Sequence, residues 1–143
     1  MREILLKMEP LAGREQSEGD AEWKPPEALE HLAHIAGADA VTELLDAFRT
    51  DMVERLTKLR HAVTKGDGAT MRIEVHSIKG SAAQMGAAKL AARCRELEIE
   101  YGRNEWTLQA SEVETLQGLF DEASMAMARH RFAGSPGPDE TAV

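Results

Sequence analysis

His76 is the residue in this sequence whose neighbours are best suited to chemistry. It stands in the segment Glu74–Gly86, which reads EVHSIKGSAAQMG, with Lys79 three residues after it and Arg72 four residues before it. On a helix these offsets bring the three side chains onto one face. An exposed imidazole is mostly unprotonated at neutral pH and is then nucleophilic, and a nearby cation can offset the charge of a bound anion. The pattern indicates a nucleophilic histidine beside an anion site.

Small residues follow His76 along the same helix. Gly80 costs about 1 kcal/mol of helix propensity relative to alanine. Ser81, Ala82 and Ala83 then leave the surface beside the ring nearly bare. This shortage of side chains predicts that another molecule approaches His76 closely. The alternative is an ordinary surface histidine, which the neighbouring lysine and glycine disfavour.

Five segments have the three- and four-residue spacing of apolar side chains that is typical of amphipathic helices. They are a short helix over about 25–36 and longer helices over about 39–65, 68–85, 87–101 and 111–131. Short connections place consecutive helices antiparallel. The predicted fold class is therefore all-α: an antiparallel four-helix bundle with a short additional N-terminal helix.

Single residues predict further details of these helices. Ile35 continues the apolar spacing of the short helix, and Gly86 is a suitable terminator for the third. Ser111 and Glu114 have the spacing of a capping box at the start of the last helix. In the third helix the apolar stripe lies roughly 130° from the arc that holds His76, so this side chain is predicted to face solvent.

Composition narrows the function classes. The formal net charge of −8 argues against nucleic-acid binding, which needs clustered Lys and Arg, and the acidic surplus is expected on solvated helix faces. Cys94 is the single cysteine, so no intramolecular disulfide can form, and its place in an apolar stripe favours a reduced core residue over a reactive thiol. No segment approaches the roughly 20 apolar residues of a membrane span. A cytoplasmic protein with protein partners is expected.

The residues from His76 to Glu98, HSIKGSAAQMGAAKLAARCRELE, resemble the signature of histidine-containing phosphotransfer (HPt) domains. That family has a His-x-x-Lys-Gly-Ser core, a glycine ten residues after the histidine, and a downstream Leu-x-x-x-Cys-x-x-Leu-Glu run. This sequence matches at His76, Lys79, Gly80, Ser81, Gly86, Leu90, Cys94, Leu97 and Glu98. The resemblance extends more loosely from about Glu27 to Arg131.

The resemblance implies a phosphorelay intermediate. His76 would accept a phosphoryl group from an aspartate of a receiver domain and return it to another, with Nε2 as the sterically favoured nitrogen and Lys79 offsetting phosphoryl charge. Arg72, Gly80, Ala83 and Gln84 would dock the partner, a response regulator receiver domain or a hybrid sensor histidine kinase. No cofactor is expected on this chain, and Mg²⁺ would be held by the receiver. A monomer is expected, without an ATP-binding motif of its own.

Several alternatives stay open at this point. The chain could be a helical adaptor or inhibitor that binds a receiver or kinase through the same face without relaying phosphate. His31 and His34 have a spacing that could hold a metal, but no third ligand is evident, so no metal site is predicted. The predicted domain boundaries are a leader and linker over 1–24, the bundle over 25–132 and a flexible tail over 133–143.

Overall fold

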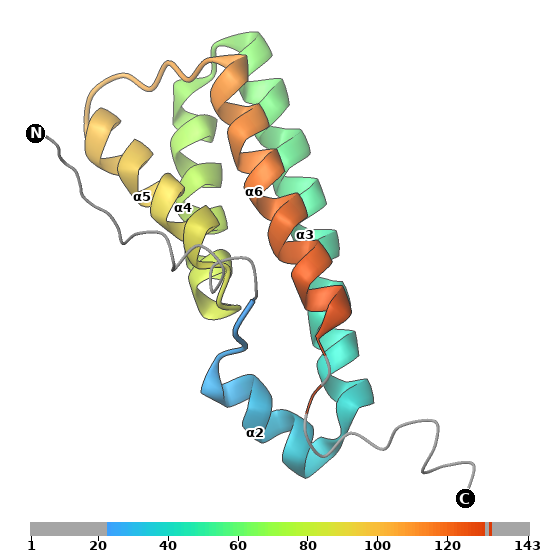
Figure 1. Cartoon of the computed structure of the whole chain (residues 1–143). Coiled ribbons are helices and arrows are strands. Elements are labelled where there is room, and N and C mark those ends of the chain that lie inside the picture. The colour runs from blue at the N-terminus through green and yellow to red at the C-terminus, as the bar shows by residue number, and fades with distance from the viewer. Residues whose placement is uncertain (1–22, 131, 133–143) are drawn as a thin grey trace, which may run out of the picture.

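The computed structural model describes residues 23–130 and Phe132, and within that part every regular element is an α-helix (Figure 1). Five helices follow one another along the chain: α2 (Glu27–Ala36), α3 (Ala38–Lys65), α4 (Gly68–Gln84), α5 (Ala88–Tyr101) and α6 (Ala110–Arg129). The prediction of an all-α bundle is confirmed. The predicted leader up to residue 22 and the tail from residue 133 lie outside the described residues, and the predicted domain boundaries stay a prediction.

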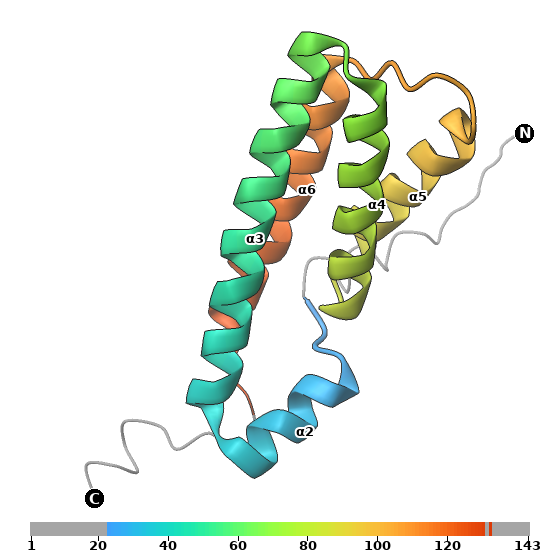
Figure 2. The same ribbon diagram turned by 180° about the vertical axis from the view of Figure 1, so that it is seen from behind.

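Consecutive helices from α3 to α6 run antiparallel (Figures 1 and 2). The contacts join α3 to α4, α4 to α5, α5 to α6 and α6 back to α3, which closes a four-helix bundle. The short helix α2 packs on α3 at the end of the bundle where α3 begins. This arrangement places α4, which carries His76, between α3 and α5.

Local signals explain where α4 begins and ends. The side chain of Asp67 accepts a hydrogen bond from the backbone N–H of Thr70 at 3.2 Å, which caps the first turn. At the other end Gly86 has a φ of +78°, a conformation that glycine adopts without strain. The prediction that Gly86 terminates this helix is confirmed.

The core is built from the apolar stripes of all five helices. The largest fully buried side chains are Met52, Leu56, Leu59, Ile78, Leu90, Leu97, Leu116, Val41, Val75, Val113 and Cys94. Burial raises the pKa of the Cys94 thiol to about 12, and the nearby carboxylate of Glu98 adds to this rise. The thiol is therefore protonated at neutral pH, as expected of a structural cysteine.

Two details of the sequence interpretation are wrong. Ile35 is 65% exposed, and α2 instead buries Leu29 and Ala33, which are four residues apart and so share one face. The last helix begins before Ser111: its N-cap is Gln109, whose backbone N–H donates to the carboxylate of Glu112 at 3.0 Å. The side chains of Trp106 and Leu108 are buried, so the connection between α5 and α6 packs against the bundle and α6 begins earlier than expected.

Trp23 lies before the predicted start of the bundle, yet it packs in the core. Its side chain is buried, and its indole N–H donates to the carbonyl oxygen of Met85 at 2.9 Å. A Cβ atom placed on Gly86 would come within 3.1 Å of the indole nitrogen and 3.0 Å of Pro26 Cδ. Gly86 therefore serves both the turn between α4 and α5 and the close packing of the segment before α2.

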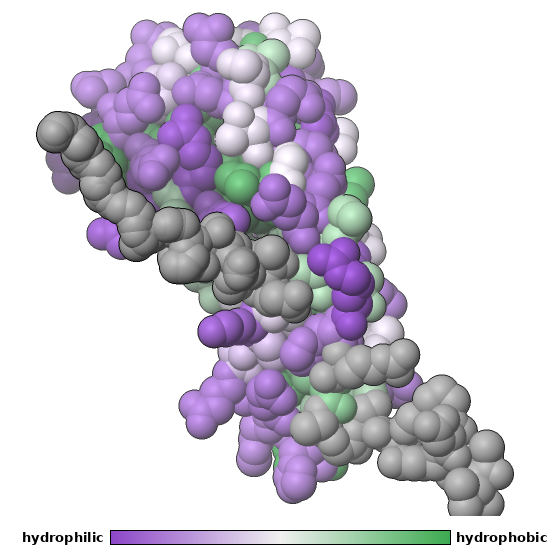
Figure 3. All heavy atoms as spheres, in the orientation of Figure 1, coloured by the Kyte–Doolittle hydropathy of each residue, from purple (hydrophilic) through white to green (hydrophobic). Residues whose placement is uncertain are grey.

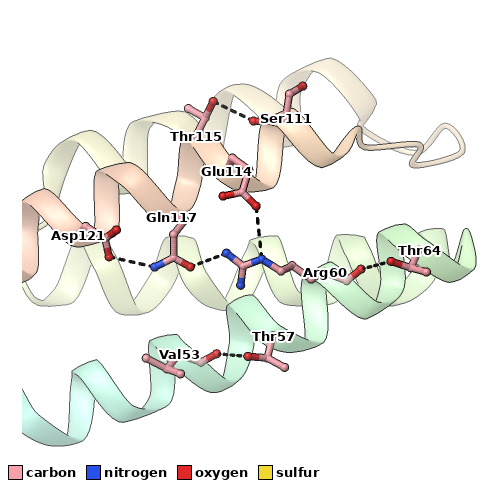
Figure 4. Close-up of polar contacts among 9 residues, drawn as sticks. All are labelled: Val53, Thr57, Arg60, Thr64, Ser111, Glu114, Thr115, Gln117 and Asp121. Atoms are coloured by element: carbon pink, nitrogen blue, oxygen red, sulfur yellow. Dashed lines mark hydrogen bonds and ion pairs between the residues drawn. The ribbon is translucent and has the colours of Figure 1, made fainter.

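Polar side chains tie α3 to its two neighbours. Toward α6, the guanidinium of Arg60 donates to Gln117 at 2.7 Å and lies 3.6 Å from the carboxylate of Glu114 (Figure 4). Toward α4, Arg55 donates to the carboxylate of Glu74 at 3.1 Å. Glu74 is buried, so the expectation that the acidic residues all lie on solvated faces does not hold for it.

The exposed surface is mostly hydrophilic on the face seen in Figure 3. The large exposed apolar side chains of the described residues are spread over all five helices: Ile35, Leu44, Val53, Ile73, Ile99 and Met125. Single exposed apolar residues of this kind are normal on the surface of a folded protein. None of the helices within residues 23–130 is long and apolar enough to cross a membrane.

Candidate functional site

His76 lies near the middle of α4 with its ring in solvent. Its side chain is 71% exposed, whereas Val75 and Ile78 on either side of it are fully buried. These apolar neighbours hold α4 against the bundle and fix the direction in which His76 points. The nucleophile predicted from the sequence therefore stands on a rigid element.

Glu98 of α5 joins His76 to Lys79. One carboxylate oxygen lies 2.8 Å from Nδ1 of His76, and the other lies 2.5 Å from Nζ of Lys79. Glu98 is only 22% exposed and Lys79 is 31% exposed, so the ion pair lies in the groove between α4 and α5. The three residues form a bridged cluster with a carboxylate at its centre.

The charge of Glu98 determines which ring nitrogen of His76 carries the proton. Burial by itself raises the pKa of Glu98, but the hydrogen bonds from Lys79 and His76 and the charge of Lys79 outweigh burial and lower it. An ionised carboxylate only accepts hydrogen bonds, so the nitrogen that faces Glu98 carries the proton. In the neutral ring this leaves the lone pair on Nε2, the nitrogen away from the carboxylate.

The other predicted site residues lie on the same helix as His76 and are exposed. Arg72, Gly80, Ala83 and Gln84 are exposed, and no hydrogen bond or ion pair within the described residues joins Arg72 to the cluster. Lys79 turns toward Glu98 of α5, so the side chains of Arg72, His76 and Lys79 do not converge on one point. A Cβ atom on Gly80 would meet nothing within 4 Å. The surface beside His76 is therefore bare, as its small residues predicted.

Glu98 is the member of this cluster that the sequence interpretation missed. It was part of the matched signature but received no role. A signal for it was available, because Gly86 marks the turn between two antiparallel helices: His76 lies ten residues before this glycine and Glu98 twelve residues after it. Residues at nearly equal distances from such a turn lie opposite each other.

Residues 23–130 and Phe132 contain no group of three or more His, Cys, Asp or Glu side chains that could hold a metal ion. His31 and His34 are both exposed on α2. The pair therefore gains no third ligand from within these residues.

Comparison with protein families decides the identity of the bundle. The family model for the Hpt domain matches residues 43–126, more than half of the chain. This chain belongs to the Hpt domain family. The matched range contains α4 and α5, and so includes His76, Lys79 and Glu98. The comparisons with curated proteins and with solved structures found no match.

Membership in the Hpt family implies a general role for the domain. An Hpt domain has a histidine phosphotransfer role in a phosphorelay and interacts with components of two-component systems. The cluster described above agrees with such a role in its chemistry, because it offers an exposed imidazole with a free lone pair on the outer nitrogen. The Hpt helical bundle thus carries its candidate site on α4 and α5.

Proposed function

We propose that this Hpt domain carries a phosphoryl group on Nε2 of His76 and exchanges it with aspartates of receiver domains. The observation that supports this most directly is the contact between Glu98 and Nδ1 at 2.8 Å. It directs the proton to the inner nitrogen and leaves the lone pair on the nitrogen that faces solvent. A partner therefore meets a nucleophile already in its reactive tautomer.

The proposed transfer step uses Nε2 of His76 as the nucleophile and Glu98 as the group that stabilises the product. The Nε2 lone pair attacks phosphorus of an aspartyl phosphate, the P–O bond to the aspartate breaks, and the partner's carboxylate leaves with that electron pair. Because Nδ1 keeps its proton, the phosphorylated ring carries a positive charge. Glu98, ionised and hydrogen-bonded to that ring, stabilises the charge. The reverse step returns the phosphoryl group to a second aspartate.

Lys79 has two tasks in this proposal. Before transfer it pairs with Glu98 and so holds the carboxylate in place beside the ring. During transfer its flexible stem lets the ammonium offset the charge on the phosphoryl oxygens. Mg²⁺, which phosphoryl transfer commonly requires, would come with the receiver domain.

Docking of the partner is proposed for the exposed face around His76. Arg72, Gly80, Ala83 and Gln84 are exposed on α4, the helix that carries His76. The small residues Gly80 and Ala83 would let a receiver bring its aspartate within bonding distance of Nε2. The partners proposed are receiver domains of response regulators or of a hybrid sensor kinase, with the Hpt domain as a monomer in the cytoplasm.

A relay is favoured over a non-relaying adaptor by the same cluster. An adaptor has no chemical need for an exposed imidazole whose tautomer is set by a partly buried carboxylate. Such a carboxylate loses hydration when it enters the groove between helices, and this loss must be offset by its partners. The arrangement is therefore better suited to a reactive histidine than to a binding surface alone.

The test is phosphotransfer from phosphorylated receiver domains. We expect acid-labile, alkali-stable phosphate on the protein, located at Nε2 of His76 by NMR, and complete loss of this label in the His76→Gln variant. His61→Gln, which changes another exposed histidine of the described bundle, is the matched control and should be labelled normally. Label that persists in His76→Gln would refute the assignment.

A further inference from the structure

Arg95 of α5 stands next to the cluster of His76, Lys79 and Glu98. Glu98 contacts both His76 and Lys79, so it marks the side of α5 that faces α4. Arg95 comes three residues before Glu98 on the same helix. Residues three apart on a helix surface are neighbours, with about 5 to 6 Å between their Cβ atoms. Arg95 therefore lies beside the carboxylate that contacts the imidazole.

Arg95 lies on the solvent side of Glu98. A step of three residues back is a rotation of about 60° around the helix, whereas Leu97, one residue back, lies about 100° from Glu98 in the opposite direction. Leu97 is fully buried, and Arg95 is exposed. Arg93, which pairs with Glu112 of α6, lies about 160° from Arg95. Arg95 therefore points away from the core and from α6, on the flank of α5 that faces α4.

His76 has the corresponding position on α4. Going around this helix from His76, Lys79 lies about 60° away and Val75 about 100° away in the same direction. Val75 is fully buried, and the side-chain exposure rises to 31% for Lys79 and 71% for His76. His76 and Arg95 thus lie at the two sides of the open edge of the groove, and the ion pair described above lies deeper between them.

The surface of α4 next to Arg95 carries small side chains. Because α4 and α5 run antiparallel, the step back from Glu98 leads about 4.5 Å toward the end of α4 that holds Gly80 and Ala83 (Figure 1). A Cβ atom on Gly80 would meet nothing within 4 Å, and Ala83 is exposed. The long side chain of Arg95 therefore has room to extend over this part of α4 toward the ring of His76.

Arg95 is a cation without a partner in the part of the chain that the structure describes, where no hydrogen bond or ion pair joins it to another residue. Glu98 is already engaged by two donors. Glu74, the single carboxylate of α4, is buried and contacts α3. Glu96 and Glu100 lie about 160° from Glu98 around α5, on the side away from α4. Arg95 is therefore free to bind an anion at the open edge of the groove.

Phosphorylation would change the charge balance of the cluster. The protonated phosphohistidine ring and Lys79 are cations and Glu98 is an anion, which gives a net charge of about +1. A phosphoryl group adds about −2, so the phosphorylated cluster would be left with about −1. Lys79 is at the same time engaged by Glu98. One further cation would complete the balance, and a guanidinium is well suited because its paired donors match phosphate oxygens.

We infer that Arg95 is a further phosphoryl-binding residue of this Hpt domain, and that its guanidinium donates hydrogen bonds to the free oxygens of the phosphoryl group on Nε2 of His76. This inference rests on the proposed function, to which it adds a residue from the second helix of the site. Arg95 forms and breaks no covalent bond in this role. It offsets negative charge on the phosphoryl group while the P–N bond forms, and so lowers the barrier to transfer.

The experiment measures phosphorylation of His76 in the whole chain with two donors. One donor is the phosphorylated receiver domain that labels wild-type His76 fastest, used at saturation, and the other is phosphoramidate, which needs no docking surface. Arg95→Met removes the charge and keeps much of the stem, and Arg95→Lys restores a cation without the paired donors. Lys89→Met is the matched control, because Lys89 is also an exposed cation of α5 but lies about 180° from Glu98.

We expect Arg95→Met to slow labelling about tenfold with both donors, Arg95→Lys to recover part of this loss, and Lys89→Met to equal wild type. Circular dichroism should show the same helix content in all of these proteins. Slowing with the receiver alone would overturn the inference, since Arg95 would then contact the partner and not the phosphoryl group. Equal rates in Arg95→Met and Lys89→Met would overturn it as well.

The two donors also separate this inference from the proposed function. If no receiver phosphorylates wild-type His76, the proposed function fails, and labelling by phosphoramidate still tests the contact between Arg95 and the phosphoryl group. If neither donor labels His76, both fail.

Discussion

Two pairs of helices in this bundle are joined by polar side chains with similar geometry and different chemistry. Between α3 and α6, Arg60 is the hub, with Gln117 and Glu114 as acceptors (Figure 4). Between α4 and α5, Glu98 is the hub, with His76 and Lys79 as donors. In both cases one side chain contacts two groups on the neighbouring helix.

The difference lies in what each bridge leaves unsatisfied. Arg60 is always charged and has no lone pair, so its bridge contains no nucleophile. The carboxylate of Glu98 accepts a hydrogen bond from Nδ1 of His76 and leaves the second ring nitrogen, Nε2, without a partner among the described residues. The comparison teaches that, of these two bridges, the one with a carboxylate hub and an imidazole donor leaves a nitrogen lone pair exposed to solvent.

Removing the charge of the reactive hub should have the largest effect on transfer. In Glu98→Gln the amide no longer balances the positive phosphorylated ring, and the loss of a hydrogen bond between charged groups is worth about 1.5 to 3 kcal/mol. Transfer from a receiver should therefore slow by roughly ten- to a hundredfold. The rate is measured by single-turnover phosphotransfer, with folding checked by circular dichroism. Wild-type rates in this variant would mean that the contact is incidental.

The same variant should change the pH dependence of stability. The pKa of Glu98 is lowered in the folded protein, so its contribution to the free energy of unfolding is present above the ordinary carboxyl pKa of about 4.3 and is lost as the pH falls through the lowered value. The stability difference between wild type and Glu98→Gln should therefore narrow below about pH 4. Denaturant unfolding at pH 3 and pH 7 tests this, and a difference that widens at pH 3 would contradict the role of Glu98 as an ionised hub.

A larger side chain at position 80 should slow phosphotransfer to His76 by an intermediate amount. Nothing lies within 4 Å of a Cβ atom placed on Gly80, so Gly80→Gln should fold with wild-type stability or better, since glycine is unfavourable inside a helix. Transfer from a receiver should fall about tenfold, which corresponds to about 1.4 kcal/mol of docking free energy. Gly118→Gln is the matched control, because Gly118 is an equally open glycine of α6. Equal transfer rates in the two variants would exclude close approach at Gly80.

Breaking the unreactive bridge should change stability and leave transfer intact. Arg60→Met removes the contacts to Gln117 and Glu114, both partly exposed, and should cost about 1 kcal/mol of unfolding free energy. For a domain of about 100 residues this lowers the Tm by roughly 4 to 8 °C. Phosphotransfer per folded molecule should equal that of wild type. A transfer defect as large as that of Glu98→Gln would erase the distinction between the two bridges.

Local pattern was sufficient to predict the helices and the side of α4 that faces solvent. The spacing of apolar residues depends only on the helical repeat, and the turns at Gly66, Gly86 and Gly102 depend on the freedom of glycine to adopt positive φ. His76 could be placed on the exposed face for the same reason, and its signature led to the family that the comparison then showed. Each of these features depends only on residues that are close together in the sequence.

Tertiary structure decided which distant side chains are in contact. The contact of Glu98 with His76 spans 22 residues, that of Arg60 with Gln117 spans 57, and that of Trp23 with Met85 spans 62. Each depends on the register and rotation of one segment against another, which are set by the packing of the whole core and not by the local repeat. The sequence by itself determined that His76 lies on the exposed face of α4, and the packing of α5 on α4 determined which of its ring nitrogens is free.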